Sequence, residues 1–415
     1  MKYRLITVLV AGSLCFGQGG YSVETTDDNR SGQSDDLTQR GIVEEISAED
    51  LEYYGLVEEE KFPIRANLDI DAYYDSNVFL RDEGTAAGIE DDFVWEVRPE
   101  IYYQTSEPGT SEHYFRVYYD PDFILFTNLS DENAISQSGG GDYLFQGDRS
   151  LFGFSHKTFE TDGANADIGA RTNRTQHDTN LYGEYQFTDK FTVEAALGQS
   201  LAFYQEIRDR HTWTGEVYAL YEVLPKVRMG IGTKIGFVDI QAAPNQSYQQ
   251  ALYRVIYEPS EKIQLNASVG AEFRQYQGPL GWEDRVTPAA SLGLVWSPFD
   301  SSTFTLTGYR NVTASNSIIG ANYVATGFDA AWRQRFFQKF YYTLGGGFEH
   351  SDYRPTVVGT VNNRRDNYYF VRNSLDYDFV KYASVSIYHK IEQNFTNSPS
   401  SFDRQQVGIA VNLSY

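Results

Sequence analysis

Long runs in which apolar and polar residues alternate limit the fold of this chain more than any other feature. Between residues 64 and 75, every second position is apolar, and the positions between carry Arg, Asn, Asp and one Tyr. Successive side chains of a β-strand point to opposite faces, so each such run has one apolar and one wet face. The pattern returns at residues 92–104, 227–237 and 263–274. The chain is therefore predicted to be all-β.

The length of these runs separates a membrane barrel from a soluble sheet. They extend for roughly 10 to 16 residues, whereas globular strands average about 5 to 6 and a tilted membrane strand needs about 9 to 11. Tight turns are predicted at 187–190, 223–226, 258–261, 297–300, 336–339 and 378–381. Longer polar connections are predicted at 277–284, 312–322, 352–367 and 394–403. Short turns that alternate with longer loops are typical of outer-membrane barrels.

The strand number follows from the placement of the two chain ends. An N-terminal tail and a last strand that both end in the periplasm require an even count. Residues 112–176 must then contain external loops around 128–134 and 161–176 and a tight turn at 146–149. We predict a transmembrane antiparallel up-and-down β-barrel over residues 64–415, with about 18 strands. Sixteen strands are the alternative, because residues 135–146 with their three glycines are poorly patterned.

The N-terminal residues predict export. A positive start, an apolar stretch over 5–16 and small residues after it indicate a signal peptide over residues 1–22. The only cysteine, Cys15, follows Leu14 where a lipidation site needs a small residue, which argues against a lipid anchor. Residues 23–63 are acidic and are predicted to form a periplasmic tail. Residues 47–61 begin like a short helix, although a solvated segment without function is the favoured reading.

The last residues, 407–415, form an amphipathic run that ends on an aromatic residue. This run resembles the terminal strand by which outer-membrane barrels are recognised by the barrel assembly machinery. Val411, Leu413 and Tyr415 are the candidate assembly signal. The predicted location is the bacterial outer membrane, with its lipid as a partner.

Charge and motif content argue against several functions. The formal net charge of -23 disfavours nucleic acid as a partner. No HExxH, GxSxG or P-loop spacing is present. The six histidines are scattered over different predicted strands and loops: His113, His156, His177, His211, His350 and His389. We therefore expect no enzyme activity, no metal site and no cofactor.

The polar faces of the strands are predicted to line the barrel interior. The candidate lining residues carry both signs of charge: Arg65, Asp69, Asp71, Glu96, Arg98, Arg228, Lys234, Glu272, Arg274 and Arg333. Opposed acidic and basic walls would create a transverse field that orients polar solutes. Alternatively, these charges neutralise one another and fill the interior, and the sequence leaves both readings open.

Inward tyrosines offer a second candidate surface. Tyrosine rings and hydroxyls can contact sugars, but such residues more often pack in the wall or at the membrane interface. The candidates are Tyr73, Tyr102, Tyr182, Tyr341 and Tyr368.

Three segments carry a family resemblance. They are residues 73–79 (YYDSNVF) after the first alternating run, then 93–99 (FVWEVRP), and later 181–190 (LYGEYQFTDK). With them the chain resembles β-barrel porin families that include outer-membrane proteins of exopolysaccharide gene clusters. The resemblance covers most of the chain after Ile64, implies an outer-membrane location and saccharide traffic, and transfers no catalytic residue.

These observations favour a porin-like channel for small hydrophilic solutes, with saccharides or other small polar solutes as its partners. An outer-membrane component of exopolysaccharide export or assembly is the first alternative. A non-conducting surface anchor or adhesin is the second, because the sequence does not reveal what the loops do.

Overall fold

The computed structural model describes residues 63–84, 88–106, 110–165, 170–278, 281, 283–315, 321–359, 363–398 and 400–414. The predicted signal peptide, Cys15, the helix over 47–61 and Tyr415 lie outside these residues. No helix in the described residues is long and apolar enough to cross a membrane.

The described chain forms eighteen strands. Their bounds are β1 Ile64–Asp75, β2 Asp92–Gln104, β3 His113–Phe126, β4 Ala134–Gln146, β5 Ser150–Asn165, β6 Ala170–Thr188, β7 Phe191–Tyr204, β8 Arg210–Leu224, β9 Val227–Ile240, β10 Gln246–Ser260, β11 Ile263–Tyr276, β12 Arg285–Phe299, β13 Ser302–Ala314, β14 Ala321–Phe336, β15 Phe340–Pro355, β16 Arg365–Val380, β17 Ala383–Thr396 and β18 Phe402–Ser414. A 3-10 turn, η2 (Ser130–Glu132), lies between β3 and β4.

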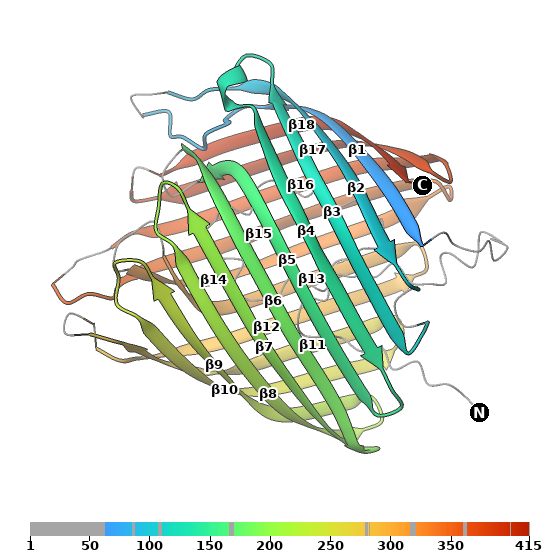
Figure 1. The fold of residues 1–415 in the computed structure, drawn as a ribbon, viewed down its shortest axis with the longest axis vertical. Helices are drawn as coiled ribbons and strands as arrows, with labels where there is room; N and C mark the ends of the chain where they lie inside the picture. The colour runs from blue at the N-terminus through green and yellow to red at the C-terminus, as the bar shows by residue number, and fades with distance from the viewer. Residues whose placement is uncertain are drawn as a thin grey trace.

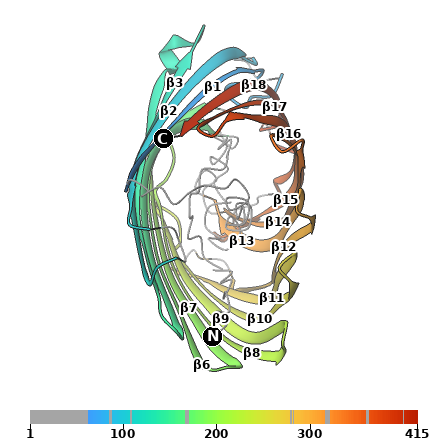
Figure 2. The same ribbon diagram turned by 90° about the vertical axis from the view of Figure 1, so that its right-hand side faces the viewer.

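The strands form one closed ring (Figures 1 and 2). Each strand pairs antiparallel with the next one along the chain, and β1 closes the ring on β18 from Asn67↔Ser414 to Asp75↔Gln406. Closure gives every strand a paired neighbour on both sides, which is what a sheet needs in a solvent that offers no hydrogen bonds. The predicted antiparallel barrel and its eighteen strands are confirmed.

The connections differ between the two ends of the barrel. At one end, here called the turn end, the connections include 147–149, 189–190, 225–226 and 261–262. At the other, the loop end, they include 76–91, 277–284 and 356–364. The predicted tight turns, including the one at 146–149, coincide with turn-end connections.

One predicted loop is wrong. Residues 161–176 are mostly strand, since β5 continues to Asn165, β6 begins at Ala170, and Thr161 pairs with Arg174. The segment reads as a loop because both of its faces are polar. Backbone pairing does not require an apolar face, so strands that pass beyond the hydrocarbon continue without the alternation that marks a membrane strand.

Glycine explains why β4 is poorly patterned. A Cβ on Gly140 would lie 2.4 Å from the carbonyl oxygen of His156 and 2.8 Å from the hydroxyl of Tyr118. No larger residue fits that space without a shift of the β5 backbone. The glycines at this position are therefore consistent with a strand, and the sixteen-strand alternative is wrong.

The two faces of the wall have opposite chemistry. The outward face is apolar, with Val269 of β11 59% exposed and Ile231 of β9 69% exposed. The residues of β11 that alternate with this outward set point into the barrel. One of them, Glu272, is only 2% exposed. Core packing is therefore confined to the barrel interior, and the exterior is left as an apolar surface.

The first loop-end connection turns into the barrel. Val78, Phe79 and Leu80 of this connection are all buried. Phe79 joins a cluster with Tyr73 and Ile124, whereas Leu80 packs with Phe402. Residues 76–81 are here called the inward segment, and they narrow the loop end beside β1, β2 and β18.

The end of the β13–β14 hairpin also turns inward, separating from β12 while β14 stays paired with β15 as far as Ala321↔Pro355. Pairing between β12 and β13 stops at Ala290↔Arg310, whereas β13 and β14 remain paired to Ala314↔Asn322. Residues 321–325 are all buried, although strand residues alternate between faces elsewhere. This hairpin end, residues 312–315 and 321–325, is called the inward hairpin, and it lies inside the ring (Figure 2).

Contacts between the neighbouring loop-end connections flank the inward hairpin. Gly281, after β11, forms a bridge with Val357, after β15. The Arg285 guanidinium donates to the carbonyl oxygen of Pro355 at 3.0 Å. The β11–β12 connection and the start of β12 therefore contact the end of β15 and the β15–β16 connection, beside the inward hairpin.

Candidate functional site

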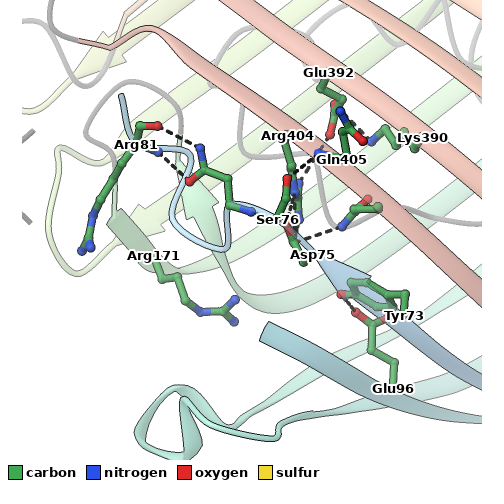
Figure 3. A network of polar contacts seen from close by, with 12 residues as sticks. Tyr73, Asp75, Ser76, Arg81, Glu96, Arg171, Lys390, Glu392, Arg404 and Gln405 are labelled. Atoms are coloured by element: carbon green, nitrogen blue, oxygen red, sulfur yellow. Dashed lines mark hydrogen bonds and ion pairs between the residues drawn. The ribbon is translucent and has the colours of Figure 1, made fainter. Parts of the chain in front are cut away.

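A buried ionic network joins the two strands that close the barrel (Figure 3). Arg404 of β18 contacts Asp75 of β1, with Nη2 and Oδ2 separated by 2.6 Å. The same guanidinium lies 3.5 Å from Glu392 of β17, which in turn contacts the Lys390 ammonium at 3.1 Å. Two cations and two carboxylates are thereby brought together out of solvent, so the network neutralises itself.

The predicted lining residues on β1 and β2 have wall partners. The Tyr73 hydroxyl donates to Glu96 at 2.6 Å, and the Tyr388 hydroxyl donates to Asp71 at 2.9 Å. The Asn412 amide donates to Asp69 at 2.5 Å. In the β1–β2 register, Arg98 lies opposite Asp69, and Arg65 lies opposite Tyr102. On this side of the barrel, the arrangement favours neutralisation within the wall over an open charged face.

The inward segment is anchored by one amide side chain. Asn77 is fully buried, and its Nδ2 donates to the carbonyl oxygens of Arg81 and Asp403 at 2.8 and 2.9 Å. Its Oδ1 accepts the backbone N–H of Arg81 at 2.9 Å. The three bonds hold a short turn inside the barrel mouth.

The opposite wall carries a second group of charges on β7 to β11. Arg254 of β10 contacts Glu194 of β7 at 2.9 Å and Glu216 of β8 at 3.9 Å. Its guanidinium carbon lies 3.4 Å from the ring centre of Tyr218. A planar cation held between carboxylates and an aromatic face is a rigid wall feature rather than a mobile charge.

The remaining predicted lining residues are divided between this wall and β14. Glu272 accepts from Arg274 at 2.7 Å, and Arg228 lies 3.7 Å from Glu258. Lys234 lies directly opposite Glu216 in the β8–β9 register. Arg333 of β14 stands over the ring of Tyr341 at 4.7 Å. The structure thus places nine of the ten predicted residues in two groups, on β1–β2 and on β9–β11, and leaves Arg333 of β14 apart from both.

Polar contacts hold the inward hairpin against β8, β10 and β11. Arg274 donates to the Val312 carbonyl oxygen at 3.0 Å, and Arg210 donates to that of Ala314 at 3.4 Å. The amides of Gln246 and Asn322 exchange two hydrogen bonds, of 3.0 and 2.8 Å. The hairpin is therefore fixed to β8, β10 and β11 mainly by arginine-to-carbonyl and amide-to-amide bonds.

A small pocket, with room of about 60 Å³ for water-sized molecules, lies between β13 and the wall formed by β8 to β12. Its polar lining includes amide and hydroxyl side chains, namely Gln250, Asn266, Ser268, Ser291, Thr307 and Asn311. The Ser268 and Ser291 hydroxyls lie 2.7 Å apart. The alternation of polar and apolar residues in the sequence places most of these side chains on the inward face. It does not reveal that they line the same pocket, which only the folded barrel shows.

The five inward tyrosines are already engaged. Tyr73 and Tyr368 donate to Glu96 and Glu392, and Tyr182 donates to Glu184 at 3.1 Å. Arginines cover the rings of the other two, Arg116 over Tyr102 and Arg333 over Tyr341. These contacts favour wall packing over sugar contact for this set.

Two of the three candidate assembly residues, Val411 and Leu413, lie on the outward face of β18, and Tyr415 lies outside the described residues. Val411 pairs with Ile70, and Leu413 pairs with Leu68 of β1. Their role in assembly stays a prediction. Among the described residues, no cluster of His, Cys, Asp and Glu could hold a metal ion.

A closed barrel with an apolar exterior and a polar interior is the architecture of outer-membrane porins. Neither a family model nor a curated protein sequence matches this chain. The solved structures it is similar to include the outer membrane protein OpdK from Pseudomonas aeruginosa, at 11% identity and a TM-score of 0.45 over 85% of this chain and 99% of that chain. They also include Pseudomonas aeruginosa OccK2 (OpdF) in complex with glucuronate, at 12% identity and 0.46 over 85% and 98%. A third is Acinetobacter baumannii OccAB4, at 10% identity and 0.43 over 86% and 100%.

Proposed function

We propose that this protein is an outer-membrane channel for small hydrophilic solutes. The observation that carries the proposal is the division of the wall into an apolar exterior and a polar, hydrogen-bonded interior around a closed ring. An apolar exterior suits lipid, and a barrel of about 18 strands is wide enough for an aqueous path. Outer-membrane lipid and the barrel assembly machinery are the corresponding partners.

Two features favour small solutes over a polymer. The inward segment packs Leu80 against Phe402, and the inward hairpin contacts β10 inside the barrel through Asn322 and Gln246. Both narrow the loop end. A polysaccharide export component would need a wider path, so the structure supports the channel for small solutes ahead of that alternative.

The proposed orientation places the turn end and the N-terminal tail in the periplasm. Short connections at the periplasmic side and longer ones outside are the usual arrangement in bacterial outer-membrane barrels. The even strand number is consistent with both chain ends on one side, since Asn67 of β1 lies opposite Ser414 of β18.

Conduction is the decisive measurement, because a barrel fold does not by itself establish transport. Purified protein in planar lipid bilayers should give stepwise ion currents. The acidic balance of the chain, a net charge of -23, predicts a modest cation preference that weakens as salt screens the wall. Absence of currents from well-folded preparations would favour a plugged barrel or a surface anchor instead.

A further inference from the structure

We propose that the barrel wall has a lateral opening between β12 and the inward hairpin, through which an amphipathic solute passes between the interior and the outer leaflet of the membrane. The opening lies where β12 (residues 285–289) and β13 (residues 311–314) run on without pairing to each other, a stretch here called the seam. β12 stays paired with β11 up to Arg285, and β13 stays paired with β14 up to Ala314. The proposal goes beyond the proposed channel, which needs only a path along the barrel axis.

A proline marks the β12 side of the seam. The N–H of Ser297 donates to the carbonyl oxygen of Lys262, beside β11, at 2.8 Å. Backbone groups alternate between the two neighbouring strands, so odd-numbered residues of β12 bond to β11 and even-numbered residues are directed toward β13. Pro288 is one of the latter and has no N–H, so it cannot donate the next bond that pairing beyond Ala290 would need. The end of the pairing is therefore encoded in the sequence.

Arginines replace β12 as the partners of the hairpin edge. The N–H of Ser315 donates to β14 at 3.0 Å, so by the same alternation the even-numbered residues of β13 are directed away from β14 and toward β12. Val312 is such a residue, and its carbonyl oxygen accepts a bond from Arg274 at 3.0 Å. The next, Ala314, accepts a bond from Arg210 at 3.4 Å. The hairpin edge can therefore stay apart from β12 without leaving these carbonyls unpaired.

The seam lies in the half of the wall nearer to the loop end. Trp296 of β12 stacks on Phe304 of β13 beside the turn end, with ring centres 5.3 Å apart, as expected for an aromatic girdle. Ala290, the last paired residue, lies six residues from Trp296 toward the loop end. Six residues of a strand tilted by about 40° rise by about 15 Å, in an apolar band about 25 Å tall. In the proposed orientation, the unpaired residues above Ala290 therefore face the outer leaflet.

Contacts at the loop end close the top of the seam. Gly281 forms a bridge with Val357, and Arg285 donates to the carbonyl oxygen of Pro355 at 3.0 Å. The seam is thus bounded above by these contacts and below by the last β12–β13 pair. It is directed sideways toward lipid rather than into the external medium.

The two sides of the seam differ in polarity. On the outward side, Val286 is 71% exposed, and Pro288 and Ala290 beside it are exposed as well. On the inward side, the small pocket is lined by Ser291 and Asn311, and its lining extends to Ala290 at the end of the pairing. An apolar outer rim and a polar inner lining suit a solute with an apolar tail and a polar end. The pocket has room of about 60 Å³, so a whole solute passes only when the hairpin moves further from β12.

The test is photo-crosslinking of the full protein in lipid vesicles. Benzoylphenylalanine in place of Asn311 should form adducts with lipid acyl chains, which mass spectrometry detects. The matched control is Thr305, which lies on the same face of the same strand but opposite Val295, where β12 and β13 are paired. Val269 on the outward face is the positive control. Adducts at Asn311 should exceed those at Thr305 several-fold, and equal adducts at these two positions, with strong adducts at Val269, would overturn the opening.

A second variant changes the seam itself. Pro288→Thr restores the missing N–H with a residue that suits a strand, so it should extend the pairing and lower the adducts at Asn311 several-fold. Octyl glucoside, below the concentration that dissolves the membrane, should block single-channel currents of the unchanged protein more strongly than those of Pro288→Thr. Glucose, which lacks the alkyl chain, should not distinguish the two.

The failure of the opening and the failure of the channel give different results. Adducts at Asn311 that Pro288→Thr leaves unchanged, or an equal octyl glucoside block of the two proteins, would overturn the opening while leaving the channel proposal intact. Heat-modifiable gel migration confirms that each variant is a folded barrel. Absence of all currents would instead contradict the channel, and the lipid adducts would still decide whether the seam opens to lipid.

Discussion

A charge placed on the outward face of β11 tests the assignment of inside and outside. Val269 is 59% exposed and lies near the middle of its strand, between Tyr253 and Ala290 in the pairing register. Arginine on the lipid face near the bilayer midplane costs about 2 to 4 kcal/mol. At 1.4 kcal/mol for each factor of ten, Val269→Arg should lower the folded-to-unfolded ratio by about 30- to 700-fold.

The measurement is a denaturant titration of the barrel in lipid vesicles, followed by tryptophan fluorescence. The matched control is Asn266→Arg, which introduces the same side chain on the same strand but into the interior. Ser268 is less suitable, because Arg254 lies directly opposite it and would repel a second arginine. Asn266 instead lies opposite Ile256. Equal losses of stability for Val269→Arg and Asn266→Arg would refute the assignment of the two faces.

Three further predictions concern topology, the buried network and the inward hairpin. A cysteine at Ser398 should react with an impermeant thiol reagent on whole cells and one at Lys226 should not; the reverse pattern would invert the proposed orientation. Arg404→Met leaves buried carboxylates without their cation, so the same vesicle titration should show a loss of roughly 3 to 5 kcal/mol, and an unchanged midpoint would show that the network is not structurally important. Asn322→Ala removes the amide pair with Gln246, so single-channel recordings should show more frequent steps between conductance levels; identical records would mean that the hairpin is not part of the constriction.

Much of this architecture is visible in local sequence. Period-two alternation identifies which residues share a face, and breaks such as 146–149 and 223–226 mark where strands end. Both are local properties, because a side chain's face depends only on its position along the strand. The strand number and the inward placement of polar residues such as Glu272 follow from the same rule. The extension of β5 and β6 was missed because alternation fails where both faces of a strand are in water.

The pairing of interior side chains depends on the closed ring. Arg404 meets Asp75 only because β18 returns to β1, and Arg274 meets the Val312 carbonyl only because the hairpin leaves its place beside β12. Residues 312–322 look like an ordinary polar loop in the sequence, since nothing local reports the arginines and the amide on β8, β10 and β11 that contact Val312, Ala314 and Asn322. Local pattern therefore determined which face each residue occupies. Contacts across the interior decided which charges pair and which segments narrow the barrel.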